Sequence, residues 1–317
     1  MNQSCPGTNT GWNRVLLKRM RAATILILAL ILVSGTVTLR IAGESESGGI
    51  TDLDGINVAV YGGGGAASHS ARALISLFEW MNASVDMIAA RNVLDGELED
   101  CDILAYPGGS AMEYYSELGQ EGLNITRNFV SDGGSYVGIC GGATFACRYY
   151  LGFFNGSTGY APYTGTGPYL INMTVNRQCA GPDLSDLPEN ITTMYWGSAY
   201  FVPREGTEIH PIASYGVNGE AGMLSFKHGQ DTVFMSSPHP EYEEGSDRDD
   251  TAFYDHLNDP DSEWELLRRV MIWLVEESSI PPELHPTQSD MTTTLVLGSV
   301  GLAGVTVVVI AIIYRKR

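Results

Sequence analysis

Short apolar runs, several of them ended by glycines, alternate with helical patterns in the first half of the chain, and this alternation constrains the fold most. The runs have the composition of β-strands; they are INVAVY (56–61), SVDMIA (84–89), DILAY (102–106) and SYVGI (135–139). Helical spacing lies between and after them, over 70–81, as a pair of helices in 111–132, and over 143–151. Such alternation predicts a mostly parallel α/β sheet with helices on both faces.

Strand patterns follow one another in the second half, and we expect several of these strands to be antiparallel. They are YLINMTV (169–175), TTMYWGSAYFV (192–202), IHPIASY (209–215), AGMLSFK (221–227) and TVFMSS (232–237). A final amphipathic pattern over 262–277 predicts a closing helix. We therefore expect one domain over residues 52–278, which is long enough to bury a full core.

Charge is distributed unevenly along the 317 residues. All 37 Asp and Glu residues lie between Glu44 and Asp290, whereas eight of the 18 Lys and Arg residues lie outside that stretch. The stretch therefore carries 10 basic against 37 acidic side chains, a net charge of −27. Such a surface would repel a phosphate backbone, so we expect no nucleic-acid partner.

Two apolar runs border the acidic domain. Residues 22–41 follow a basic tail over 1–21, and residues 291–314 lie between a Pro-rich linker over 279–290 and a basic end over 315–317. Each run is long enough to cross a hydrocarbon core of about 30 Å, so we expect two transmembrane helices that flank the domain. The first run also fits a cleaved signal peptide, which likewise begins with positive charges and an apolar stretch.

The basic ends predict the topology. Under the positive-inside rule both ends lie in the cytoplasm and the domain lies outside the membrane. N-x-S/T glycosylation signals agree with this placement, since five begin in the predicted outer region, at Asn82, Asn124, Asn155, Asn172 and Asn190. Another signal, at Asn2, lies on the predicted inner side, so these signals support the topology without deciding it. The lipid bilayer is thus an expected partner, and any protein partner is left open.

The segment GICGG (138–142) places Cys140 between a predicted strand and a predicted helix. This is the thiol version of the nucleophile elbow, in which small neighbours let the chain turn sharply at the carboxyl end of the sheet. The helix N-terminus would lower the thiol pKa toward the reactive thiolate. A buried structural cysteine is the alternative interpretation of this segment taken alone.

A base and a carboxylate follow about a hundred residues later, in SSPHPEYEE. His239 comes directly after a predicted strand, and Glu241 lies two residues further on. A carboxylate in that position can hold an imidazole in the tautomer that a general base needs. Alone, H-P-E is more often a solvated turn; in the order Cys, then His-x-Glu, it indicates a catalytic triad.

Together these motifs resemble the class I glutamine amidotransferase superfamily, which has a flavodoxin-like fold and a Cys, His, Glu triad that ends in H-P-E. The chain is more similar still to the N-terminal domain of biotin-protein ligases, where a strand ends in YPGG and a helix leads into GGSYLGICAGAY. Here the sequence has YPGGSAMEYYSELGQEG and then FVSDGGSYVGICGGATFA, within a resemblance over roughly residues 55–245. Gly141 and Thr144 depart from the family pattern. What remains of the chain is too short for a ligase catalytic domain, so ligation of biotin is not implied.

The resemblance implies a role for each matching residue. Cys140 would be the nucleophile, His239 the general base and then acid, and Glu241 the carboxylate that orients it. Gly109 and Gly141 would supply backbone N–H groups for an oxyanion hole. Residues just beside that loop are expected to line the substrate pocket or simply to pack at the surface; they are Gly108, Glu113 and Tyr114.

Other candidate sites are weaker. The GGGG segment at 62–65 lacks the Lys-Ser/Thr of a P-loop, so we expect it, with His69, to line the mouth of the same pocket. The acidic stretch 245–261 has no calcium-loop spacing and is expected to be a solvated loop. We expect no cofactor and no metal. Besides Cys140 the outer region holds three cysteines, Cys101, Cys147 and Cys179, so one of them stays free if the other two pair. A disulfide between Cys147 and Cys179 is conceivable.

The sequence thus predicts a membrane-anchored, extracytoplasmic Cys-His-Glu hydrolase or amidotransferase-like domain that acts on an amide C–N bond through a thioester. Two alternatives remain open at this stage. One is a ligand-binding or scaffold module of the same fold without turnover, and the other is the glutaminase subunit of a separate synthase.

Overall fold

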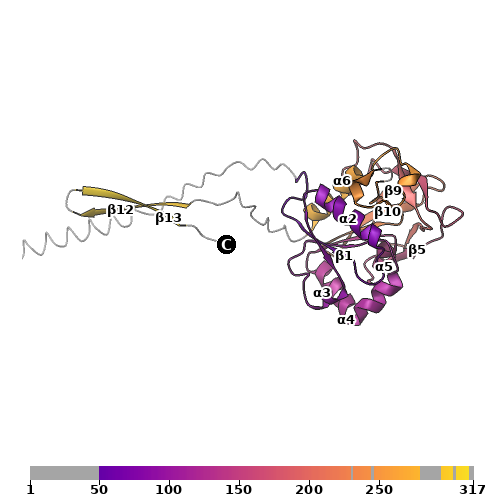
Figure 1. Ribbon diagram of the computed structural model, residues 1–317, viewed down its shortest axis with the longest axis horizontal. Coiled ribbons are helices and arrows are strands. Elements are labelled where there is room, and N and C mark those ends of the chain that lie inside the picture. Colours follow the sequence, from indigo (N-terminus) through magenta and orange to yellow (C-terminus); the bar gives the residue numbers. More distant parts are fainter. Residues whose placement is uncertain (1–49, 230, 244–245, 279–293, 303–304, 314–317) are drawn as a thin grey trace, which may run out of the picture. The chain divides into compact units, whose positions relative to one another are not determined.

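The computed structural model describes residues 50–229, 231–243 and 246–278, together with two strands near the C-terminal end. The chain divides into two compact units at residues 48 and 49, and all of the described residues belong to the second. Figure 1 shows the described domain as one sheet with helices packed against it.

The core of the domain is a nine-stranded sheet with the order β2-β1-β3-β4-β11-β10-β9-β6-β7. Its first five strands are all parallel, and they are β2 (Ser84–Ile88), β1 (Asn57–Tyr61), β3 (Ile103–Tyr106), β4 (Ser135–Ile139) and β11 (Asp231–Ser236). This order, 2-1-3-4 and then one further strand, is the flavodoxin-like one, in which ligands bind beyond the carboxyl ends of the strands. The predicted mostly parallel, flavodoxin-like sheet is therefore confirmed.

The other four strands extend the sheet in antiparallel fashion, as the sequence predicts. They are β10 (Ala221–His228), β9 (His210–Tyr215), β6 (Tyr169–Val175) and β7 (Asn190–Tyr195). The predicted strand over 192–202 is in fact two strands, because the chain turns at Gly197, which has φ of 58°. The second, β8 (Phe201–Pro203), pairs with β5 (Gly156–Thr158) in a separate small sheet.

Helices cover both faces of the sheet, and strand residues alternate between the two resulting cores. Val58 and Val60 of β1 face α2 (Ser68–Trp80) and α6 (Trp264–Glu277), whereas Ala59 and Tyr61 face the other side. That side is covered by α3 (Ala90–Leu94), α4 (Ala111–Ser131) and α5 (Gly141–Ala146). The predicted helical pair is found in α4, where Gly119 interrupts the helix with φ of 58°.

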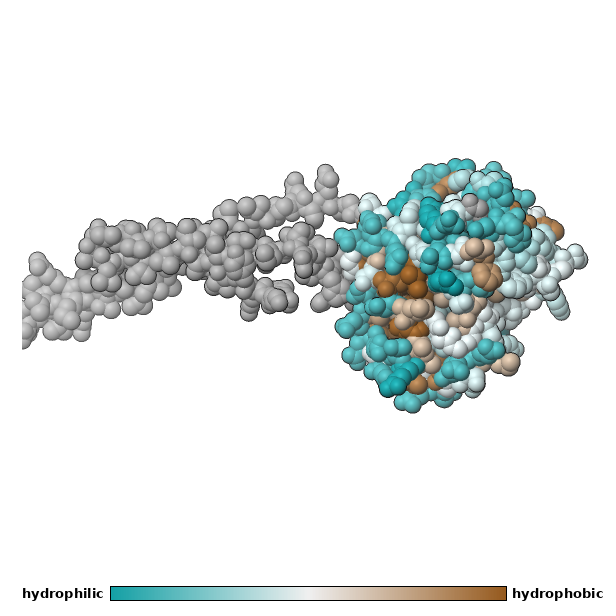
Figure 2. All heavy atoms as spheres, viewed as in Figure 1, coloured by the Kyte–Doolittle hydropathy of each residue, from teal (hydrophilic) through white to brown (hydrophobic). Residues whose placement is uncertain are grey.

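One predicted helix is shorter than expected. The pattern over 143–151 gives only α5, which ends at Ala146, because Cys147 has an extended backbone and bridges to Phe154. Figure 2 shows that the viewed face of the domain is mostly polar, with apolar residues gathered in a limited patch near β1. Two 3-10 turns, η1 (Asp247–Asp249) and η2 (Asp255–Leu257), lie in the acidic stretch before α6.

No helix of the described residues is both long and apolar enough to cross a bilayer. The predicted span over 22–41 lies outside those residues, as do the tail over 1–21, the linker over 279–290 and the end over 315–317. Within 291–314 the structure has two antiparallel strands, β12 (Thr294–Leu302) and β13 (Val305–Ile313), so the helix expected there is wrong. The run is rich in Val, Ile and Thr, whose β-branched side chains favour extended backbone over helix.

Candidate active site

Cys140 lies in a tight turn between β4 and α5, at the carboxyl edge of the parallel strands. Its backbone has φ of 49° and ψ of −103°, a conformation that non-glycine residues adopt rarely and that is characteristic of strained functional turns. The turn fits only because its neighbours lack side chains. A Cβ on Gly138 would lie 2.7 Å from the Gly142 carbonyl carbon, and one on Gly142 would lie 2.1 Å from the Tyr106 carbonyl oxygen. The structure therefore contains the elbow that the sequence predicts.

His239 and Glu241 form a buried pair just beyond the end of β11. Nδ1 of His239 donates to Oε1 of Glu241 at 2.9 Å, and the two residues are 3% and 0% exposed. The His239 amide donates to the Met194 carbonyl at 2.9 Å, which holds this segment against the end of β7. Glu241 thus fixes the tautomer in which Nε2 is free to exchange a proton.

Ser70, which the sequence did not indicate, connects the carboxylate to the glycine loop. Its hydroxyl donates to Oε1 of Glu241 at 2.7 Å and accepts the amide hydrogen of Gly108 at 2.8 Å. Trp264 donates its indole N–H to the Glu241 carbonyl at 3.0 Å. No local motif marks Ser70, because its role depends on contacts with residues 38 and 171 positions away.

The surroundings of His239 favour its charged form. Burial of the imidazole lowers its pKa, but the Glu241 carboxylate and the Cys140 thiol raise it by more, so the pKa rises to about 10. Within the described residues Nε2 is buried and makes no hydrogen bond of ordinary geometry. Because Nδ1 is taken by Glu241, Nε2 is the atom left to serve Cys140.

This raised pKa predicts that stability falls as pH rises. An ordinary histidine has a pKa of 6.5, so between pH 6.5 and about 10 folded His239 holds a proton that the unfolded chain has lost. The free energy of unfolding should be largest below pH 6.5 and decrease through this window. Urea unfolding of the full chain at several pH values measures it, with Glu241→Gln as the matched control. An equally steep slope in that variant would show that the Glu241–His239 pair is not the cause.

The predicted oxyanion-hole residues lie next to each other and to Cys140. A Cβ on Gly141 would be 2.1 Å from the carbonyl oxygen of Gly109 and 2.8 Å from the nitrogen of Gly109, so the two backbones are in direct contact. Gly109 has φ of 153°, and a Cβ there would be 2.1 Å from the Gly65 carbonyl oxygen. Neither amide donates a hydrogen bond to another residue in the part of the chain that is described. Both N–H groups are therefore available beside the nucleophile.

Gly108 makes room for the base. A Cβ at this position would lie 2.6 Å from Cε1 of His239. We therefore expect Gly108→Ala to displace the imidazole and to lower kcat of any amide turnover about a hundredfold, in the range that a mispositioned catalytic group costs. Gly134→Ala is the control, because its Cβ would meet only the Phe129 ring, at the amino edge of β4 and away from the triad. Unchanged kcat in Gly108→Ala, with Gly134→Ala also unchanged, would show that this contact does not position His239.

Tyr114 and Glu113, which the sequence places beside the glycine loop, lie at the start of α4. Tyr114 is fully buried, and its hydroxyl is within hydrogen-bond distance of the Pro107 and Gly108 carbonyls, at 3.0 and 3.2 Å. Tyr114 thus supports the YPGG loop from beneath. Glu113 is exposed, and its amide donates to the Ser110 hydroxyl at 3.3 Å.

Among the described residues, the cysteines other than Cys140 form no disulfide. Cys101, Cys147 and Cys179 are free thiols, which corrects the conceivable 147–179 pairing. Cys147 packs in the core on one face of the sheet and Cys179 against the core on the other, so the sheet separates them. Cys101 lines a cavity of about 530 Å³ at the amino edge of β3 and β4, which contacts none of the triad residues. Burial raises the pKa of Cys101 to about 11.

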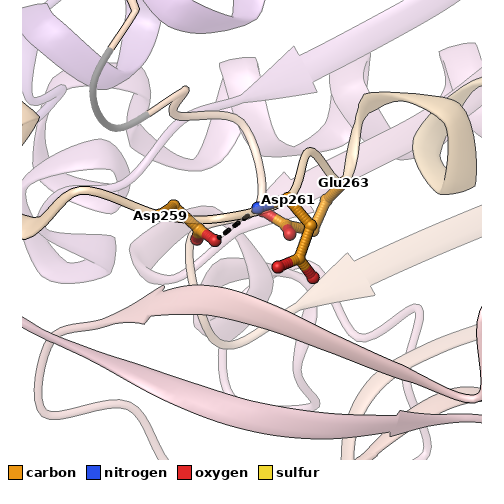
Figure 3. A group of neighbouring side chains, drawn as sticks. All are labelled: Asp259, Asp261 and Glu263. Carbon is orange, nitrogen blue, oxygen red and sulfur yellow. Dashed lines mark hydrogen bonds between the residues drawn. The ribbon is translucent and has the colours of Figure 1, made fainter.

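Most described residues of the acidic stretch 245–261 are exposed, as the sequence predicts, and carboxylates gather at its C-terminal end. One carboxylate oxygen each from Asp259, Asp261 and Glu263 lies within 4.8 Å of the others (Figure 3). Glu263 is 1% exposed, and burial, with nearby Asp261 and Glu243, raises the pKa of Asp259 to about 6. Among the described residues these are the side chains arranged to hold a cation. The Asp261 amide donates a hydrogen bond to Oδ1 of Asp259 at 3.2 Å, which is a contact within the same loop.

Comparison with known proteins supports the resemblance seen in the sequence. The family model described as "Biotin-protein ligase, N terminal" matches residues 56–161, a stretch that includes the YPGG loop and Cys140. An uncharacterized protein of Chlamydia muridarum is 28% identical, over 45% of this chain and 62% of that protein. The chain thus spans less than two thirds of that relative.

Solved structures with similar folds include two from Thermotoga maritima. PurLQS is 15% identical, with 69% of this chain and 99% of that chain covered and a TM-score of 0.49. A glutamine amidotransferase is 17% identical, with 70% and 96% covered and a TM-score of 0.45. Residues 56–161 are therefore similar to the N-terminal domain of biotin-protein ligases.

Proposed function

We propose that the protein is a cysteine-dependent enzyme that cleaves an amide C–N bond. One observation carries the proposal: Cys140 lies in a strained turn at the edge of the sheet, and His239 and Glu241 form a buried pair. Nδ1 of His239 bonds to Glu241, so Nε2 is the nitrogen left to exchange a proton with Cys140. A purely structural cysteine has no need of a buried, charged imidazole, which is costly unless it is paired. The fold class supports a glutamine amidotransferase or hydrolase type of chemistry.

The reaction we propose proceeds through a thioester. The Cys140 thiolate attacks the amide carbonyl carbon, and the oxygen takes up the negative charge next to the Gly109 and Gly141 amides. The C–N bond then breaks as the N–H at Nε2 of His239 gives its proton to the leaving amine. Water next loses a proton to His239 and attacks the thioester, which releases a carboxylic acid and restores the thiol.

Release of ammonia or amine from a panel of amides tests this proposal. We expect the full chain to hydrolyse at least one member of a panel that contains glutamine, simple carboxamides and short peptide amides. Iodoacetamide at neutral pH should label Cys140 faster than the other three described cysteines. If no amide is cleaved and Cys140 reacts no faster than an unfolded thiol, a ligand-binding or scaffold module is the better description.

Glutamine in this panel also distinguishes the second alternative. Turnover of glutamine that exceeds turnover of every other amide would indicate the glutaminase subunit of a separate synthase. We favour hydrolysis of another amide, because the chain carries no synthase motif in the described domain and an outer location is unsuited to the transfer of ammonia. Cleavage confined to glutamine would refute that preference.

We further propose that the domain faces outward, anchored through residues 22–41. The basic tail before that run and the acidic domain after it support this orientation. All five asparagines of the predicted outer glycosylation signals are exposed, as modification would require; they are Asn82, Asn124, Asn155, Asn172 and Asn190. External protease added to intact cells should digest the domain, and complete protection, with digestion only after lysis, would contradict this location.

A further inference from the structure

Five aromatic side chains form a cluster that adjoins the catalytic pair through Tyr242, and three separate segments supply them. We name this group the aromatic collar; its members are His69, Trp196, Tyr242, Phe253 and Tyr254. His69 lies in the first turn of α2, Trp196 follows β7, and the others come from the segment between β11 and η2. Rings from segments this far apart in sequence meet here because all three segments end at the same edge of the sheet.

The collar has open faces. The ring of His69 is nearly parallel to that of Trp196, at 17° with centroids 6.5 Å apart, and Tyr254 stands across both, at 85° and 78°. Parallel rings in full contact would be about 3.5–4.0 Å apart, so His69 and Trp196 do not cover each other. Phe253 does cover one face of His69, since the two rings are stacked at 17° with centroids 3.9 Å apart. Trp196 and Phe253 remain 43% and 47% exposed. Clustered exposed aromatics are characteristic of binding surfaces.

The collar adjoins the reacting groups. Tyr242 lies 5.6 Å from His239 between ring centroids, and its hydroxyl pairs with Nδ1 of His69. Residue Met194, two positions before Trp196, accepts the amide hydrogen of His239. A group bound to the collar would therefore stand directly beside the catalytic imidazole.

Tyr254 supplies an unused polar group to this site. The residue is 6% exposed, and among the described residues its buried hydroxyl has no hydrogen-bond partner. Its backbone has φ of 73°, which is strained for a bulky residue and is kept only where the surroundings require it. A buried hydroxyl without a partner is costly, so a ligand that bonds to it would gain affinity. Burial, Glu241 and Cys140 raise the pKa of Tyr254 to about 12, so the hydroxyl keeps its proton to donate.

Charges around the collar favour a neutral guest. Burial lowers the pKa of His69, and although Glu241 raises it, His239 and Arg72 lower it further, so the ring is uncharged at neutral pH. The cationic groups that act on His69 disfavour a second cation there. The acidic stretch that carries Phe253 and Tyr254 disfavours an anion.

We propose that the aromatic collar is the substrate subsite and that it selects an amide whose acyl group carries an uncharged planar ring. The ring would lie against Trp196, which His69 leaves uncovered, and the Tyr254 hydroxyl would donate to a polar atom of the substrate. This inference rests on the proposed amide cleavage at Cys140. The preferred substrate would thus be an amide with a ring-bearing acyl group, and not one with a linear side chain such as glutamine.

Binding to the full-length Cys140→Ala variant tests the subsite without turnover. Benzamide is the probe, benzamidine and benzoate are cationic and anionic molecules of similar shape, and butyramide has no ring. Calorimetric titration should give at least about tenfold tighter binding of benzamide than of each of the other three, since a ring contact is worth about that factor. Equal binding of butyramide, or preference for either charged molecule, would overturn the proposal.

Substitutions in the same background assign the contacts. Trp196→Ala should weaken benzamide binding about tenfold, whereas Trp196→Phe, which keeps a ring, should largely retain it. Tyr254→Phe should weaken it about fivefold through loss of the hydroxyl alone. Tyr149→Ala removes an aromatic that is 69% exposed and not in the collar, so it serves as the control. Unchanged affinity in both Trp196→Ala and Tyr254→Phe, with each variant folded by circular dichroism, would overturn the proposal.

Measurement of turnover distinguishes failure of the proposed subsite from failure of the proposed amide cleavage at Cys140. If the parent chain cleaves glutamine but Cys140→Ala binds no ring preferentially, the subsite is wrong and the amide chemistry stands. If benzamide binds as expected and no amide is cleaved, the subsite stands as a binding site and the proposed chemistry fails.

Discussion

Replacement of Cys140 by alanine is expected to abolish amide turnover, with a loss of about 10⁴-fold or more. The thiol is the only group at the turn that can form the covalent intermediate, and loss of a nucleophile from a triad typically removes most of the rate enhancement. Cys140→Ser should also be nearly inactive, because a hydroxyl is far harder to ionise than a thiol. Steady-state release of ammonia or amine measures both variants.

Cys101→Ala is the matched control for this experiment. Cys101 is likewise partly buried, but it precedes β3 at the opposite edge of the sheet and contacts none of the triad. Its replacement should leave turnover within about twofold, as expected for a site away from the chemistry. Activity retained in Cys140→Ala at the parent level, with a native circular dichroism spectrum, would refute the covalent mechanism.

Loss of the Glu241 side chain should have the second-largest effect, and it should act on stability as well as on rate. Glu241→Ala removes the acceptor of both His239 and Ser70 and leaves a buried imidazole without its carboxylate. Breaking a buried pair of this kind typically costs about 3–5 kcal/mol. A base in the wrong tautomer should lower kcat about 10⁴-fold. Urea unfolding and turnover together measure these two effects.

Glu241→Gln separates orientation from charge. The amide oxygen can still accept from Nδ1, so the variant should lose less stability than Glu241→Ala while the imidazolium loses its counter-charge. Ser70→Ala, which keeps the carboxylate, should reduce kcat by about tenfold only, as expected for loss of one hydrogen bond to a charged group. If Ser70→Ala proved as damaging as Glu241→Ala, the serine would have a larger part than a supporting contact.

The fold of the parallel half could be predicted because its signals are local. β1, β3 and β4 are each short apolar runs bounded by turn residues, and α2 follows with regular apolar spacing. The helix predicted over 291–314 was wrong because hydropathy does not distinguish a helix from strands: the run that contains β12 and β13 is as apolar as a spanning helix. The order of the strands has no such local signal, and the position of β11 beside β4 joins residues about a hundred positions apart.

The site was predictable to the extent that motifs carry it. GICGG marks the turn at Cys140, and the order Cys, then His-x-Glu, together with the family resemblance indicated that His239 and Glu241 belong with it. The sequence does not indicate that Tyr114, an aromatic next to the glycine loop, is fully buried on α4. Ser70 and Tyr254 have no motif at all, because each gains its importance from contacts or from burial that form only in the folded chain.

The spacing between thiol and imidazole is fixed by the sheet itself. The Cys140 amide donates to the Ser236 carbonyl at 2.7 Å, at the end of the parallel pairing of β4 with β11, and His239 follows three residues later. The family match ends at residue 161, so it includes the nucleophile and stops before the base. That stretch therefore holds the thiol without its base and without β11. Relatives recognised by that stretch alone can therefore keep the cysteine and differ in the reaction that it serves.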